Sequence, residues 1–431
     1  MAAHPRGERH LPHRHRRLGG VRGHPDLSAT TPRSLTLRRY RVDVRDTALR
    51  RIGQIDSYTS LDVIVRHLDV GAWTIVLPAD HPHAGLFASG HGVMIWTDDA
   101  PEPLLTGPLT SIRHDWSATG GGTLTFSGVC DNTALAARLA FPDPTRTPDT
   151  GNGRYSVDYW PSAGPAGDII NRLVAANAGP AALPGRRVLG LDPGPTTGLG
   201  DATKVSLRFD TLLSATQTLA TTAGLSVRIT QPDPTTPRLA LQIGTTRDLR
   251  GAVRFSPDLG NLGSYSYQLT APRTTRAVVA AQGQGKDRFF WQWAAPDAEA
   301  EWARVGETFV DQRDTAIPGR LDDSDEQFRS LHTSATNALQ QGGAQAELSL
   351  APIDTEQCQY GRDYRTGDTV TVTTTAGTDL VYPVREVHLT DTTDASSVQA
   401  TVGTEAATQT PALYTQVRRL WQAVHALNTR Y

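Results

Sequence analysis

Apolar and polar residues alternate along most of this chain, which is the period of a β-strand with one buried face. The alternating runs are short, and turn residues such as Gly and Pro separate them. This pattern predicts small antiparallel barrels or sandwiches. The expected strands cover 37–44, 61–65, 72–77, 92–96, 109–116 and 123–129 and then, after a change of period, 253–256, 265–269, 276–280, 289–293, 308–310, 369–375, 380–389 and 397–402.

A helical period appears in the middle of the chain. Residues 166–177 place aliphatic side chains on one helix face, and Gly179 followed by Pro180 is expected to end this helix. A second helix is expected to begin at Asp210, a residue type that favours the N-cap, and to end at Gly224. Further expected elements are strands at 225–229 and 239–243 and helices at 133–139 and 324–341.

The last segment has the sharpest local pattern. After Pro411 the apolar positions are four, three, four and three residues apart, which is the spacing of a coiled-coil seam. A helix this short is marginal alone, so it needs partner chains or a packing surface of its own domain, and both interpretations stay open. The residues of this candidate seam are Leu413, Val417, Leu420, Val424 and Leu427.

Composition and charge exclude some functions. The formal net charge is −2 over 431 residues, which gives no overall attraction to nucleic acid or to an anionic membrane. No apolar run is long enough to predict a membrane span. The first 35 residues are rich in Arg and His but have little apolar surface to bury, so a disordered tail is expected. Cys130 and Cys358 lie far apart, and we expect buried free thiols rather than a disulfide.

The chain has no convincing catalytic, cofactor or metal motif. The run from Gly283 to Lys286 lacks the ending of a phosphate loop and predicts a hairpin turn. His81 and His83 lie in an expected loop, which is weak evidence for a metal site. Acidic residues near Asp311 identify no glycosidase pair, and the flanks of Cys358 match no nucleophile signature for a pair with His388. We therefore expect no enzymatic activity and no cofactor.

The only local aromatic cluster comprises Trp291, Trp293 and Trp302. Alternating Trp residues in a strand more often pack a core or an interface than bind a ligand. A carbohydrate-binding face for these residues remains the alternative interpretation.

Several ordered sequence pieces resemble the minor tail proteins of long-tailed phages of actinobacteria and other Gram-positive hosts. None of these pieces is catalytic, and the resemblance extends from about residue 36 to residue 405. The pieces are 55–61, 73–78 and 107–109 in the first part, 177–181 and 186–187 in the middle, and 247–248, 253–256, 260–262 and 360–370 in the last part.

The resemblance implies a tail-hub protein with two small β-barrel-like domains, an α+β insertion between them and assembly as a homotrimer. A tail tube consists of hexameric rings, and three chains with two similar domains each would present six equivalent surfaces to it. The implied partners are the distal tail protein ring, the tail tube or tape-measure protein, and fibre or receptor-binding proteins. A receptor protein for cell-wall glycans and a peptidoglycan hydrolase are the alternatives.

The expected fold class is therefore mainly β with α+β insertions and a C-terminal helix. The expected segments are a basic tail at 1–35, a first barrel-like domain at 36–145, the insertion at 146–249, a β-rich segment with a helix at 250–345, the remainder of the second barrel-like domain at 346–407 and the heptad helix at 408–431.

Overall fold

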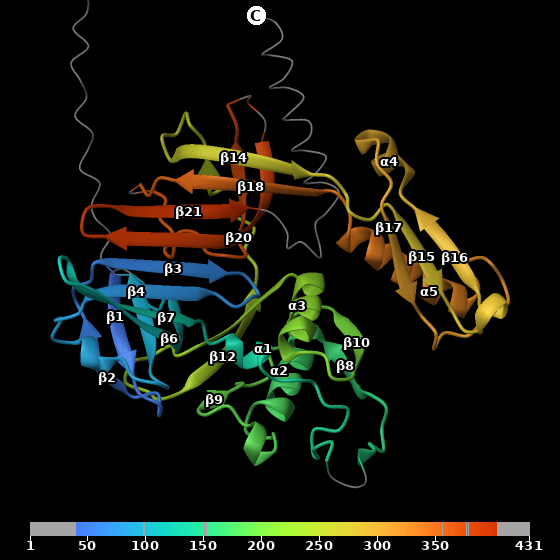
Figure 1. Cartoon of the computed structure of the whole chain (residues 1–431), viewed down its shortest axis with the longest axis horizontal. Coiled ribbons are helices and arrows are strands. Elements are labelled where there is room, and N and C mark those ends of the chain that lie inside the picture. Colours follow the sequence, from blue (N-terminus) through green and yellow to red (C-terminus); the bar gives the residue numbers. More distant parts are fainter. Residues whose placement is uncertain are drawn as a thin grey trace, which may run out of the picture. The chain divides into compact units, whose positions relative to one another are not determined.

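Strands predominate in the computed structural model, which describes residues 40–402 without 98–99, 150–152, 356, 376 and 378. The described chain is 41% strand and 17% helix, as the alternating pattern predicts. Most strands belong to one 13-stranded sheet, and smaller sheets accompany it (Figure 1). The candidate seam from Leu413 to Leu427 and the basic tail lie outside the described residues.

The first β region buries one face of each amphipathic strand. Leu61 and Val63 are buried on one strand, and Trp73, Ile75 and Leu77 are buried on the next. A short helix, α1 (Thr133–Ala136), follows the last strand. The strands are β1 (Tyr40–Arg45), β2 (Arg51–Ile55), β3 (Ser60–Arg66), β4 (Ala72–Pro78), β5 (Gly92–Thr97), β6 (Leu105–Ser117) and β7 (Gly121–Val129).

Strand β6 belongs to two parts of the sheet. Its first residues pair with β5, and its later residues pair with β7. The register with β7 shifts between Leu109 and Ser111, where the strand passes from one partner to the other. A bulge bends a strand and increases its twist, so it suits a corner between two sheets. Residues 118–120 form the turn that joins β6 to β7, and Gly121, the first residue of β7, has a φ of 73°.

The second β region has a corner strand of the same kind. Residues 379–383 of β20 pair with β19, and residues 384–391 pair with β21, with a register shift between Val384 and Glu386. The strands of this region are β13 (Arg254–Phe255), β14 (Leu262–Thr270), β18 (Gln345–Pro352), β19 (Thr369–Thr373), β20 (Asp379–Thr392) and β21 (Ser396–Val402).

The two β regions follow the same strand path. Neighbouring strands run β1-β5-β6-β7-β4-β3 in the first region and β13-β19-β20-β21-β18-β14 in the second. When each set is numbered in chain order, these two paths are identical. The two-residue strand β13 differs because it pairs with β19 in parallel, whereas β1 pairs with β5 antiparallel. Strand β2 is an addition to the first region.

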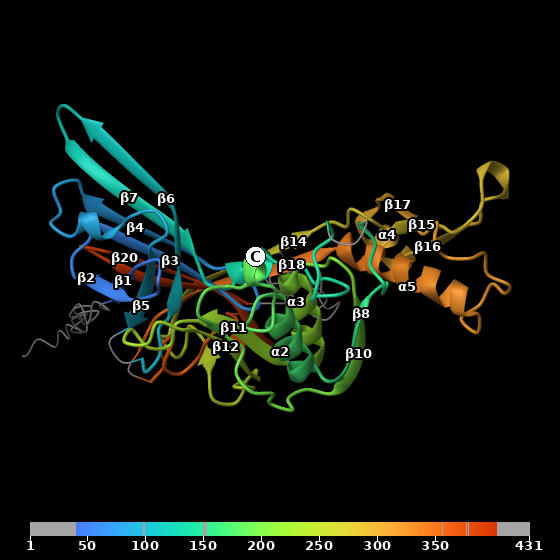
Figure 2. The same ribbon diagram turned by 90° about the horizontal axis from the view of Figure 1, so that it is seen from below.

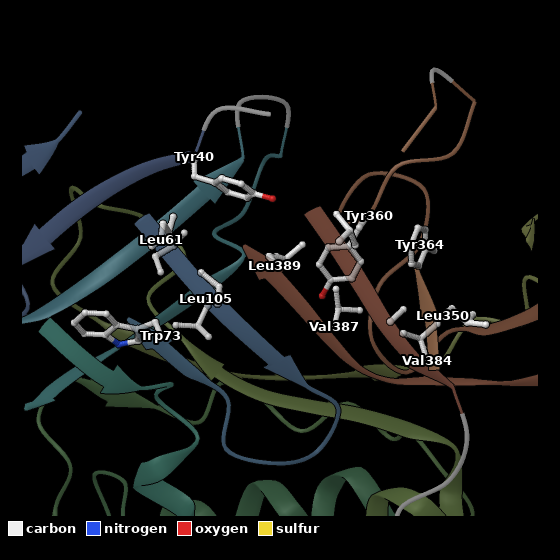
Figure 3. Close-up of a cluster of buried hydrophobic side chains, with 14 of the residues drawn as sticks. Tyr40, Leu61, Trp73, Leu105, Leu350, Tyr360, Tyr364, Val384, Val387 and Leu389 are labelled. Carbon is white, nitrogen blue, oxygen red and sulfur yellow. The ribbon is translucent and has the colours of Figure 1, made fainter. Parts of the chain in front are cut away.

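A strand joint unites the two regions. Residues Ser60–Arg66 of β3 pair antiparallel with residues 386–392 of β20. Buried side chains of both regions form one core across this joint, including Leu61 and Trp73 on one side and Val387 and Leu389 on the other (Figure 3). Among the described strands the path is open and neither region closes into a barrel.

The insertion between the regions contains two packed helices and short strands. Helix α2 (Ala166–Asn177) has the predicted bounds, and α3 (Leu212–Ala223) ends at Gly224, which adopts the left-handed conformation with φ 63°. The N-cap of α3 is Thr211 and not the predicted Asp210, because the Thr211 side chain accepts the Ser214 N–H. The strands are β8 (Trp160–Pro165), β9 (Leu191–Asp192), β10 (Ala202–Leu207), β11 (Leu225–Thr230) and β12 (Leu239–Thr245).

A separate three-stranded sheet lies in the chain between β14 and β18. Helix α5 packs on this sheet through Leu331 and Ala335, and Asp325 caps its N-terminus by accepting two backbone N–H groups. The predicted turn at Gly283–Lys286 joins two of the strands. The elements are β15 (Arg276–Ala280), β16 (Phe290–Ala294), α4 (Pro296–Trp302), β17 (Glu307–Asp311) and α5 (Glu326–Gln341).

Candidate functional site

Two of the three predicted aromatic residues face a helix. The rings of Trp291 and Trp293 on β16 lie 5.5 and 5.4 Å from the ring of Phe328 on α5. Trp293 also stacks on His332 at 5.5 Å with an interplanar angle of 8°. Trp302 is the last residue of α4. The geometry therefore gives Trp291 and Trp293 a packing role between sheet and helix.

The opposite face of the same sheet carries exposed aromatic residues that the sequence did not single out. Phe290 is 49% exposed and Phe309 is 56% exposed. The Arg288 guanidinium lies 5.7 Å from one ring centroid and 5.8 Å from the other. Strand alternation places Phe290 and Trp291 on opposite faces, and the sequence could not show which face the helix covers.

The acidic residue that the sequence offered for catalysis is held in ion pairs. The carboxylate of Asp311 pairs with Arg288 and Arg313. These partners lower the pKa of Asp311 to about 2, with the hydrogen bond from Arg313 as the largest cause. A carboxylate with such a low pKa remains ionised at neutral pH and is a poor general acid.

The cysteine thiols and the His388 imidazole also lie in environments that do not activate a nucleophile. Burial raises the pKa of both Cys130 and Cys358 to about 11, and both cysteines are free, as predicted. Cys358 is buried and Cys130 is half-buried. His388 Nε2 lies 2.7 Å from Asp62 Oδ2 across the β3–β20 joint. A thiol with a raised pKa is a weak nucleophile at neutral pH.

The histidines near residue 83 bond to separate partners. His81 Nε2 lies 3.1 Å from Ser57 Oγ, and His91 Nδ1 lies 2.7 Å from the Leu86 carbonyl oxygen. Within the described ranges, no group of three or more His, Cys, Asp or Glu side chains could hold a metal ion. No helix in the same ranges is long and apolar enough to cross a membrane.

A buried polar network holds the α+β insertion against the first β region. The Arg45 guanidinium donates to both carboxylate oxygens of Asp131, at 3.1 and 2.6 Å, and to Gln231 Oε1 at 3.1 Å. Thr106 Oγ1 donates to Asp131 and accepts the Gln231 N–H. These side chains are almost fully buried. A buried charge pair with satisfied hydrogen bonds tolerates little change in geometry, so the network fixes how the insertion docks.

A small cavity of about 90 Å³ lies where the insertion meets both β regions. The Glu102 carboxylate accepts from Arg228 and lies 3.9 Å from Arg365, so it links the insertion to the second region. Burial is the main cause that lowers the pKa of Arg228. Burial also lowers the pKa of His67 to about 4, so this imidazole is neutral at neutral pH. The cavity is a junction of structural elements with no catalytic constellation.

Two strand edges carry surface that the described part of the chain leaves open. Strand β14 ends the sheet path and pairs only with β18. The outer part of β6, residues 111–117, pairs only with β7 (Figure 2). On this part of β6, Trp116 is 72% exposed and Ile112 is 48% exposed. The alternating sequence predicted the strand at 109–116, but it could not show that these two side chains have a described neighbouring strand on one side only.

A family of phage proteins matches most of this chain. The family model of the siphovirus ReqiPepy6 Gp37-like protein matches residues 41–404. No curated protein matches the sequence significantly. The fold is similar to that of the tail protein from Neisseria meningitidis MC58, with a TM-score of 0.51 and 16% identity, over 88% of this chain and 98% of that one.

A second solved structure gives the same result. It is the 43 kDa tail protein of prophage MuSo2 from Shewanella oneidensis, with a TM-score of 0.50 and 11% identity, over 85% of this chain and 99% of that one. At such low identity these structures establish the fold alone. The family match covers most of the chain and confirms the resemblance stated from the sequence. The chain therefore belongs to the siphovirus ReqiPepy6 Gp37-like family and has the fold of phage tail proteins.

Proposed function

We propose that this siphovirus-family chain is a structural tail protein of the virion and serves as the hub at the tail tip. In this role it closes the tail tube as a homotrimer and connects the tube to the distal tail ring and to fibre or receptor-binding proteins. The observation that carries the proposal is the repeated strand path of the two β regions. Three chains with two such units each offer six equivalent surfaces to a hexameric tube ring.

The domain assignment supports this role. The barrel-like hub domains are assigned to 36–145 and to the second β region, which ends within 346–407. The insertion at 146–249 docks on the first region through Gln231, whose side chain accepts from Arg45 and whose backbone N–H donates to Thr106. The helix at 408–431, with the seam residues Leu413 to Leu427, is assigned to the trimer axis, where three copies would bury the heptad positions.

The mass of the purified protein tests the proposal. Size-exclusion chromatography with light scattering is expected to give three times the chain mass. Removal of residues 411–431 should weaken the trimer, because the axial helices would be lost. A full-length protein that stays monomeric at high concentration would contradict the hub, and an unchanged oligomer after truncation would contradict the axial role of the helix.

The alternative functions have less support. Glycan binding by Trp291, Trp293 and Trp302 requires accessible rings, but the first two pack on α5. A tail-associated hydrolase requires an activated nucleophile or a carboxyl group with a raised pKa, and neither Cys358 nor Asp311 has this property. Saturable binding to host cell-wall glycans would favour the receptor function, and clearing of purified peptidoglycan would favour the hydrolase.

A further inference from the structure

The open edge of β14 and the open outer part of β6 are equivalent to two strands that already pair within the chain. In the common path, β3 corresponds to β14 and β20 corresponds to β6. Strand β3 pairs with β20. We propose that β14 of one chain pairs in the same way with β6 of the next chain, so that the sheet continues from subunit to subunit. This inference rests on the proposed trimeric hub and identifies its contact surface.

The bulges align the two corner strands residue by residue. Both register shifts occur where the strand changes partner, between Leu109 and Ser111 in β6 and between Val384 and Glu386 in β20. Aligned on this point, Ile112 corresponds to Val387 and Trp116 corresponds to Asp391.

The inner strands align without further assumption. Ile75 on β4 lies opposite Phe126 on β7, and Leu350 on β18 lies opposite the equivalent residue on β21, Ala400. Leu61 lies opposite Ile75, and Tyr265 lies opposite Leu350. Tyr265 of β14 therefore corresponds to Leu61 of β3.

The internal joint then predicts the register between chains. Within the chain, Asp391 lies opposite Leu61, Leu389 opposite Val63 and Val387 opposite Val65. When each residue of this joint is exchanged for its structural equivalent, the same register gives an antiparallel pairing of β6 with β14 of the neighbouring chain. The expected opposite pairs are Trp116 with Tyr265, His114 with Tyr267 and Ile112 with Leu269.

The chemistry of the two edges fits this register. Tyr265, Tyr267 and Leu269 share the face of β14 that packs toward the core and are half-buried. Ile112 lies opposite Phe126, which is 2% exposed, yet Ile112 itself is 48% exposed because no described strand lies on the other side of β6 at this point. A neighbouring strand would place these apolar and aromatic side chains against one another.

Strand β14 also lacks the features that keep a free edge from pairing. Its sequence from Leu262 to Thr270 contains no charged residue and no Pro. Natural edge strands are usually protected by Lys, Pro or a covering element, so an uncharged open edge of nine residues indicates a pairing surface. A contact between β14 and β6 joins two different surfaces, and such a contact forms a closed ring when the rotation between neighbours is one third of a turn, as the proposed trimer requires.

A disulfide between chains tests the register. The variant with Trp116→Cys and Tyr265→Cys places two thiols directly opposite each other in the proposed pairing. Mild oxidation should give dimers and trimers on a non-reducing gel, and reductant should reverse them. The matched control carries Trp116→Cys with Ser266→Cys, which is shifted by one residue and faces the other side of the sheet. We expect at least a tenfold lower yield of cross-linked chains from this control.

The possible outcomes distinguish a failure of the β6–β14 pairing from a failure of the proposed trimeric hub. Cross-linked trimers in the matched variant alone support the pairing. A protein that is trimeric by light scattering but cross-links no better in the matched variant than in the shifted one would overturn the pairing and leave the hub standing. A protein that remains monomeric under reducing conditions and gives no cross-link after oxidation would overturn both.

Discussion

The two β regions share one strand path but differ at their edges. In the first region β20 covers the outer edge of β3, whereas in the second region the equivalent strand β14 has only β18 as a neighbour among the described strands. The side chains at equivalent positions of the two corner strands β20 and β6 also differ in burial. At the internal joint Val387 and Leu389 are almost fully buried, but at the equivalent positions of β6 Ile112 is exposed and His114 replaces the leucine. One joint therefore contributes to folding, and we assign the other to assembly.

The largest expected loss of stability comes from the buried polar network between the first region and the insertion. The side chains of Arg45 and Asp131 are only 4% and 5% exposed. Asp131→Ala would leave the Arg45 charge buried and unpaired, so the free energy of unfolding should fall by about 3–5 kcal/mol. Chemical denaturation measures this change. The control is Arg238→Gln, which breaks the exposed pair with Asp192 and should change stability by less than about 1 kcal/mol. Equal effects of the two substitutions would contradict the docking role.

A pair of equivalent substitutions compares the two joints directly. Leu389 is 1% exposed in the β3–β20 joint, so Leu389→Ala should reduce the free energy of unfolding by about 2–5 kcal/mol. His114→Ala at the equivalent position of β6 should leave the unfolding of the separated chain almost unchanged. Urea titration at low protein concentration compares the two variants. A large loss for His114→Ala would show that β6 is already part of the folded core.

Acid should weaken the internal joint. Burial lowers the pKa of His67, next to β3, from its usual value of 6.5 to about 4, against a smaller opposing effect of Asp368. The neutral imidazole is favoured in the folded chain, so stability is fully present above about pH 6.5 and falls between pH 6.5 and 4, by about 2–3 kcal/mol. His67→Gln should flatten this part of the pH profile, and the exposed His114→Gln should not. The measurement is the free energy of unfolding at a series of pH values. Identical pH profiles of this free energy for wild type and His67→Gln would contradict the role assigned to His67.

The smallest change in the free energy of unfolding is expected for Trp116→Ala, which should instead weaken the trimer. Trp116 is 72% exposed in the single chain, so Trp116→Ala should leave the unfolding of the separated chain within about 0.5 kcal/mol of wild type. If the ring packs on Tyr265 of the next chain, its removal should weaken the trimer by about 2 kcal/mol or roughly thirtyfold. Sedimentation of a dilution series measures the dissociation. Unchanged association would remove Trp116 from the interface.

Much of the fold was predictable because local patterns and tertiary packing agree. Helix α2 has the expected bounds, and the corner strands were recognised as strands from their alternation. Strand β8 was missed because its sequence from Trp160 to Pro165 includes a Gly and two Pro residues, which argue against a strand. The strand forms nevertheless, because it is an edge strand in a two-stranded sheet with β10.

The candidate surfaces were less predictable. Alternation shows which residues share a face, but exposure depends on a neighbour across the strand edge, which is a long-range property. From the sequence, Trp291 was therefore a candidate binding residue although it packs on α5, whereas Trp116 was not a candidate although it is exposed. The strand path that the two regions share was not predictable from the sequence, because many different apolar residues can fill equivalent core positions.

In the proposed assembly, three chains form a ring of six equivalent β units. Averaged electron micrographs of the purified protein, viewed along the ring axis, test it most directly. A ring of this kind should give a closed threefold particle with six similar lobes around a central opening. A twofold particle, or a threefold particle in which only three β units contribute to the ring, would contradict it.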